Sequence, residues 1–172
     1  MFTKEKLKIW APSLFLLPFI VYYTLNNGKF TFIDYLNLLI HEGGHGIFSF
    51  FGKFLHVLGG TLMQIIIPGM FVIYYLANKK RIMTQIFLVW LGRNLINISI
   101  YAADARAQKL PLLGGKKVYH DWTYLLNQTG MLEYDDVAGK VFYFSGVMVF
   151  VISFLLPLII KDYKPVKIEL DL

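Results

Sequence analysis

His41, Glu42 and His45 stand at the spacing of an HExxH motif inside an apolar stretch. On a helix, residues four apart lie on one face, so both imidazoles can reach the same metal ion. A glutamate beside the first histidine can hold and deprotonate a water molecule at that ion. The three residues therefore predict a metal-dependent hydrolase site, with His41 and His45 as ligands and Glu42 as general base.

The stretch around this motif is apolar enough to lie in a membrane, where ionisable side chains are costly and usually functional. Of the 172 residues, 56% are hydrophobic and 16% are charged, against about 25% charged in a typical soluble domain. A soluble, very apolar helical domain is the disfavoured alternative, because several apolar runs are long enough to span a bilayer. A second alternative is that the polar residues of the motif only stabilise helix packing.

The apolar runs predict an all-α protein, a polytopic transmembrane bundle that forms one membrane-embedded domain over residues 1–172. About five spans are expected, at 9–25, 32–51, 60–77, 82–103 and 137–160, with a polar loop at 104–136. Glycines at 59 and 60 indicate that the segment 53–62 is re-entrant or irregular. No small-residue cleavage site follows the first run, so we interpret it as a retained span rather than a signal peptide.

Charge and cysteine content narrow the class further. The net charge is +6, and the basic residues cluster at the ends of apolar runs, as in lipid headgroup contact and not as in nucleic-acid binding. The absence of cysteine excludes disulfides and thiolate ligands. We expect an integral protein of a bacterial inner membrane, whose partners are membrane lipids and a membrane-embedded peptide substrate.

A catalytic zinc site usually has three protein ligands, so two histidines need a third partner. Without cysteine the candidates are few, and the sequence leaves open Asp104, His120 and Asp121. Asp104 could instead pair with a neighbouring basic residue at the membrane interface. Asp121 could instead cap a short helix.

A polar stripe supports Asp104. If 82–103 is helical, Asn94, Asn97, Tyr101 and Asp104 recur every three or four residues on one face. A polar stripe on an apolar helix should face the interior of the bundle. We therefore expect Asn94 or Asn97 to hydrogen-bond the substrate backbone or a developing oxyanion.

The HEGGH segment in one apolar helix, and the run from Asn94 through Asn97 to Asp104 in a later one, resemble the site-2-protease family of intramembrane zinc metallopeptidases. The resemblance implies His41 and His45 as ligands, Glu42 as general base and Asp104 as third ligand. The chain also resembles an uncharacterised bacterial branch of these HExxH membrane proteins. That likeness implies a site cluster of Asp104, Arg106, His120 and Asp121, in which Arg106 supports the ligands.

The expected function is that of a Zn²⁺-dependent peptidase that hydrolyses a peptide bond within or near the bilayer. Two alternatives keep the same site. One is a metal-dependent hydrolase of a lipid or another amide, and the other is a metal-binding membrane protein without enzymatic activity.

Overall fold

The computed structural model describes residues 4–26, 29–113 and 119–160. Within these ranges the regular structure is entirely helical, which confirms the all-α prediction. Its α-helices are α1 (Lys4–Leu25), α2 (Phe32–Phe48), α3 (Lys53–Ala77), α4 (Arg81–Ala103), α5 (Asp121–Gln128) and α6 (Asp135–Ile159), with 3-10 turns at Ser49–Phe51 and Leu132–Tyr134.

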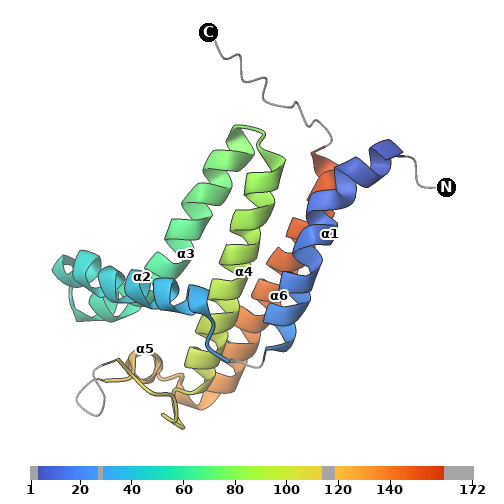
Figure 1. Cartoon of the computed structure of the whole chain (residues 1–172). Coiled ribbons are helices and arrows are strands. Elements are labelled where there is room, and N and C mark those ends of the chain that lie inside the picture. The colour runs from blue at the N-terminus through green and yellow to red at the C-terminus, as the bar shows by residue number, and fades with distance from the viewer. Residues whose placement is uncertain (1–3, 27–28, 114–118, 161–172) are drawn as a thin grey trace.

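The long helices α1, α3, α4 and α6 form a bundle in which α4 packs against the other three (Figure 1). Four helical segments of the described chain are long and apolar enough to cross a membrane, which fits a membrane protein. These segments are Lys6–Leu25, Lys53–Ala77, Arg81–Ala103 and Leu132–Ile159.

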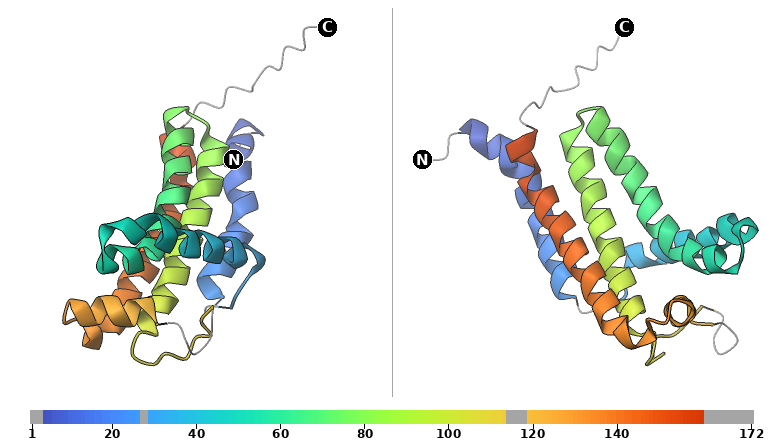
Figure 2. Two further views of the ribbon diagram at one scale, coloured as in Figure 1. Left: turned by 90° about the vertical axis from the view of Figure 1, so that its left-hand side faces the viewer. Right: turned by 180° about the vertical axis from the view of Figure 1, so that it is seen from behind.

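Helix α2 differs from these four, because it lies across the long helices instead of along them (Figures 1 and 2). Its 17 residues span about 26 Å at 1.5 Å per residue, and it is not among the candidate membrane spans. The predicted fifth span at 32–51 is therefore not confirmed. The physical reason is that α2 places its ionisable residues on one face, so that only the opposite face suits hydrocarbon.

The segment 53–62, predicted to be re-entrant or irregular, is helical. Helix α3 begins at Lys53, and its first turns run beside α2 before the helix continues along α4 (Figure 2). Glycines allow this approach, because a Cβ on Gly44 would lie 2.2 Å from the carbonyl oxygen of Gly59. A Cβ on Gly60 would lie 2.5 Å from Nε2 of His41. Gly59 and Gly60, in the first turns of α3, therefore determine how closely the HEGGH segment of α2 packs against α3.

A buried ion pair holds the start of α2 against the middle of α4. The Arg93 guanidinium donates to both carboxylate oxygens of Asp34, at 3.0 Å from Nε and 2.5 Å from Nη2, and both side chains are at most 1% exposed. Asn97 Nδ2 donates to Asp34 at 3.1 Å, and the Thr31 backbone N–H donates at 2.7 Å. The carboxylate is thus fully surrounded by donors, which offsets the cost of burying its charge.

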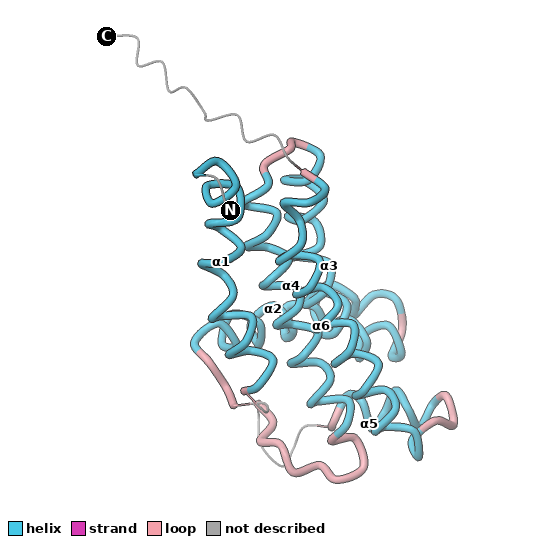
Figure 3. The backbone as a smooth tube through the Cα atoms, turned by 90° about the vertical axis from the view of Figure 1, so that its right-hand side faces the viewer, coloured by secondary structure: helices cyan, strands magenta, loops and turns pink. Residues whose placement is uncertain are grey.

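The short helix α5 docks on the end of α4. The Asp121 backbone N–H donates to the Tyr101 hydroxyl at 3.1 Å, and the Thr123 hydroxyl donates to the Ala105 carbonyl. Beneath these contacts lies a buried apolar cluster of Ile98, Ala102, Ala105, Trp122, Leu125 and Leu126. Helix α5 and the loop between α1 and α2 lie at the same end of the bundle (Figure 3).

Replacing Arg93 with methionine should destabilise the protein by about 3–5 kcal/mol, because it leaves the Asp34 carboxylate buried without its main partner. Thermal unfolding of the purified protein in detergent measures the change. The double variant Arg93→Met/Asp34→Asn removes the charge as well and should recover most of the loss. A double variant that is no more stable than Arg93→Met would contradict this account of the pair.

Candidate metal centre

Two histidines of α2 meet an aspartate at the start of α5. Asp121 Oδ2, at the start of α5, lies 2.8 Å from Nε2 of His41 and 3.3 Å from Nε2 of His45. The three atoms all lie within 4.8 Å of one another, a spacing that could hold a metal ion. Ligands bound about 2.0–2.1 Å from one tetrahedral ion lie about 3.3 Å apart, which is close to the observed distances.

The structure places Asp104, the third ligand implied by the family resemblance, elsewhere. Asp104 ends α4, and its two carboxylate oxygens accept from the backbone N–H groups of Lys109 and Leu110, each at 2.9 Å. It therefore closes the loop that follows α4. Asp121, the alternative candidate, is the residue that the fold brings to His41 and His45.

His120 and Arg106, the other members of the expected cluster, also lie outside the group of three. His120 Nδ1 accepts from the Thr123 backbone N–H as the N-cap of α5, and its Nε2 lies 3.6 Å from Asp104. Arg106 donates to Asp135 at the start of α6, with Nη2 at 2.6 Å. The structure thus places Arg106 in an ion pair that joins the segment after α4 to the start of α6.

Hydrogen bonds from α4 through α3 determine which nitrogen of His41 carries its proton. The Trp90 carbonyl can only accept, so Asn94 directs its Nδ2 to it at 3.1 Å and its Oδ1 to Gln64. Gln64 donates Nε2 to that oxygen at 3.4 Å and so presents Oε1 to His41 Nδ1, at 3.0 Å. Nδ1 must then carry the hydrogen, which leaves the Nε2 lone pair directed at Asp121.

His45 is oriented by the main chain of α3 in the same way. Its Nδ1 lies 2.8 Å from the His56 carbonyl oxygen, which can only accept, so Nδ1 carries the hydrogen. In return, His56 Nδ1 donates to the His45 carbonyl at 2.8 Å. The Nε2 lone pair of His45 is therefore also directed at Asp121.

Three acceptor atoms thus converge on one point, and such a group requires a cation at its centre. In the metal-free site that cation is a proton. The hydrogen bond with Asp121 raises the pKa of His45 to about 9, against the opposing effect of burial. Burial alone would raise the pKa of Asp121, but hydrogen bonds with His41 and His45 lower it to about 2. Two neutral imidazoles and a carboxylate are ligand types that transition-metal ions such as Zn²⁺ accept, so these residues could hold a metal ion.

A cavity of about 1140 Å³ adjoins the three acceptors. Glu42 lies on its wall and is exposed, one residue beyond the first histidine. Asn97 also lines the cavity, whereas Asn94 is fully buried in the relay to Gln64. Of the two residues expected to contact substrate, the structure therefore places only Asn97 at the cavity.

Sequence reasoning missed Gln64, and did not connect His56 or Tyr101 with the metal ligands. Gln64 is the single amide in a long apolar run, and an isolated polar residue of that kind is a signal of interior hydrogen bonding. The His56 contribution is a backbone carbonyl, which carries no sequence signal.

Comparison of the chain with protein-family models, curated proteins and solved structures finds no match.

The metal-free protein should lose stability as the pH rises from about 6.5 to about 9. His45 has a raised folded-state pKa, so its protonation stabilises the fold fully below the ordinary value of 6.5, and the contribution is lost as the pH rises through about 9. The depressed pKa of Asp121 gives stability that is present above 3.8 and lost as the pH falls through about 2. Unfolding temperatures of chelator-treated protein from about pH 2 to above pH 9 measure both effects. The alkaline decline should shrink in His45→Gln.

Gln64→Leu should weaken metal binding by about 10- to 100-fold, because His41 loses the acceptor that fixes its Nδ1 proton. Competition with a chromophoric chelator measures the affinity of the purified protein. Gln64→Glu keeps an acceptor and should restore part of the loss. Gln85→Leu removes a buried glutamine that bonds Ser13 and Ser153, so it tests for a general effect of instability. Equal losses in Gln64→Leu and Gln85→Leu would contradict the relay.

Proposed function

We propose that this protein is a zinc-dependent peptidase embedded in a membrane by four spans, with α2 lying across them. His41 Nε2, His45 Nε2 and Asp121 Oδ2 would hold the ion. The observation that carries the proposal is the convergence of these three atoms, each with its lone pairs directed inward, beside an exposed glutamate and a cavity. We further propose a bacterial inner membrane as its location, a choice supported by the absence of cysteine.

A bound zinc ion would act as a Lewis acid towards a water molecule and the substrate carbonyl. Glu42 is exposed at the cavity beside the first proposed ligand, where it would serve as the general base that accepts a proton from water and as the acid that returns it to the leaving amine. Asn97 donates its amide hydrogen to Asp34 at 3.1 Å, which leaves Oδ1 to accept from a substrate backbone N–H. Gln64 and the His56 carbonyl keep both imidazoles in the tautomer that presents Nε2.

Metal content of protein purified in detergent without chelators tests the ligand set. Wild type should carry about one transition-metal ion per chain, as expected for a single site with three ligands. His41→Ala and Asp121→Asn should lose the ion, and Asp104→Asn should retain it. A wild-type protein without metal would contradict the proposal, and loss of metal in Asp104→Asn but not in Asp121→Asn would contradict the ligand set.

Hydrolysis tests the activity, with Glu42→Gln as the decisive variant. The protein in liposomes is incubated with peptides from digested membrane proteins, and new amino termini are identified by mass spectrometry. Wild type should cleave, and Glu42→Gln should bind metal without cleaving. Release of fatty acid or amine from the lipids instead of peptide cleavage would indicate the lipid or amide hydrolase. Metal binding without Glu42-dependent hydrolysis of either kind would indicate a non-enzymatic metal protein.

A further inference from the structure

The candidate metal centre lies toward the α5 end of the bundle. Helix α4 contains 23 residues, which span about 35 Å at 1.5 Å per residue, close to the hydrocarbon thickness of about 30 Å. Tyr101, in the last turn of α4, contacts the site twice. Its hydroxyl accepts from the Asp121 N–H at 3.1 Å, and its ring centroid lies 5.9 Å from that of His41. His41 also bonds Gln64, which contacts Asn94 near the middle of α4, so the site lies between the middle of this span and its α5 end.

Charged residues line the cavity beside the metal centre. Glu42 and Lys53 both lie on its wall and are exposed, and Lys53 Nζ lies 4.9 Å from the ring centre of Tyr124 on α5. Charges are costly against hydrocarbon but not at a water-filled opening. The cavity wall also includes residues 110–113 and Tyr119, all of which follow the end of α4 in the chain. Tyr119 is 88% exposed.

Helix α2 separates this cavity from an apolar surface. The cavity side of α2 carries residues at the three- and four-residue spacing of one helix face, namely Asp34, Tyr35, Leu38, His41, Glu42 and His45. The exposed residues elsewhere on α2 include Phe32 at 91% and Leu39 at 70%. A helix with one polar and one apolar face lies along a boundary between water and hydrocarbon.

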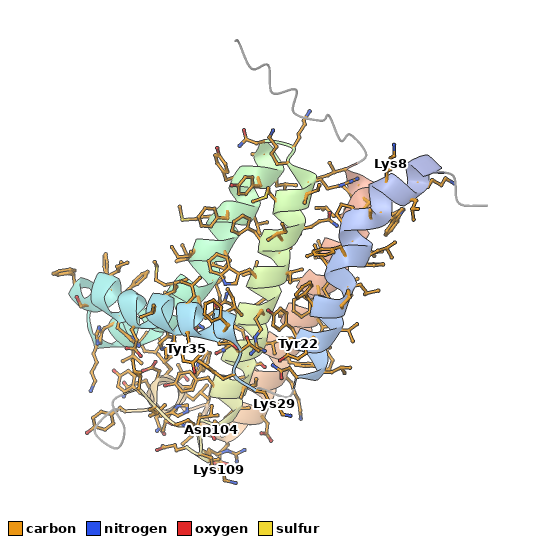
Figure 4. All side chains as sticks on the ribbon, viewed as in Figure 1. Lys8, Tyr22, Lys29, Tyr35, Asp104 and Lys109 are labelled. Atoms are coloured by element: carbon orange, nitrogen blue, oxygen red, sulfur yellow. The ribbon has the colours of Figure 1, made fainter. Side chains whose placement is uncertain are left out.

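The polar side of α2 faces the end of the bundle that carries other hydrophilic residues. Figure 4 places Tyr35, Lys29, Asp104 and Lys109 toward the end where α5 lies, and Lys8 at the opposite end. The cavity side of α2, which carries His41 and His45, therefore faces the α5 end of the bundle.

We propose that the cavity opens to water at the α5 end of the bundle, and that the metal centre acts on a polar, extended segment flanking a membrane anchor. A bond in the centre of the bilayer would not reach the site by this opening. The inference rests on the proposed peptidase function and adds the class of substrate and its route of entry.

An extended segment suits the site better than a helix does. In a helix the carbonyl groups are already hydrogen-bonded along the axis, whereas an extended backbone presents its N–H and C=O groups to the walls. Asn97 of α4 lines the cavity beside the start of α2 and offers its Oδ1 as an acceptor to such a backbone. In water, the unpaired groups of the segment remain solvated until it enters, so no polar backbone crosses hydrocarbon.

Cysteine accessibility tests the opening, and the natural sequence is free of cysteine. Leu38→Cys places a thiol on the cavity wall, and Leu39→Cys places one on the neighbouring, exposed apolar side of α2. Lys109→Cys, on the exposed loop after α4, gives the reference rate in water. Each variant in liposomes is treated with a charged methanethiosulfonate and, separately, with uncharged N-ethylmaleimide.

The charged reagent should modify Leu38→Cys within about tenfold of the rate for Lys109→Cys, and Leu39→Cys at least about a hundredfold more slowly, because a thiol in hydrocarbon rarely ionises. N-ethylmaleimide should still modify Leu39→Cys. Reaction of Leu38→Cys with the uncharged reagent only would show that the cavity opens to lipid and would overturn the proposal. Equal, fast reaction of both with the charged reagent would place all of α2 in water and would also overturn it. These rates need neither metal nor activity, so this inference and the proposed function can fail separately.

Discussion

The ion pair between Asp34 and Arg93 is the interaction on which the rest of the structure depends. Helix α2 packs mainly against α3, and it contacts α4 far less extensively than α3 does. Two charges that are at most 1% exposed, with Asn97 and the Thr31 backbone as further donors, hold its beginning at one position on α4. Because charged hydrogen bonds in a medium of low dielectric are strongly directional, they fix the direction of α2 as well as its position.

The other end of α2 is positioned by shape instead of charge. Gly44 lies against the backbone of Gly59, so close that neither position has room for a side chain. This contact brings α3 near enough for Gln64 and the His56 carbonyl to reach the two imidazoles. Helix α2 thus combines an electrostatic anchor at its start with close packing near its end, with His41 between the two and His45 directly after Gly44.

The long apolar helices and the shared face of His41 and His45 can be predicted from the sequence, because hydrophobic runs and the four-residue spacing are local properties. The direction of α2 depends on the ion pair between Asp34 and Arg93. These two residues are 59 positions apart, and no periodic pattern in the sequence indicates that they pair. The third proposed ligand is equally hard to predict from the sequence. Asp104 and Asp121 are both acidic residues at helix ends in a polar region, and only the docking of α5 on Tyr101 distinguishes them. Whether the site hydrolyses peptides is a separate question, which the fold alone does not decide.

The separation of the ligands along the chain has a consequence for biosynthesis. Asp121 lies 80 residues after His41, and both α3 and α4 come between them. During synthesis the two histidines emerge and are inserted well before the carboxylate exists, and two imidazoles alone bind a metal weakly. A tight site forms only when α5 folds back onto the completed bundle. Acquisition of the ion would then be the last step of maturation, so a nascent chain remains inert while it is still being threaded into the membrane.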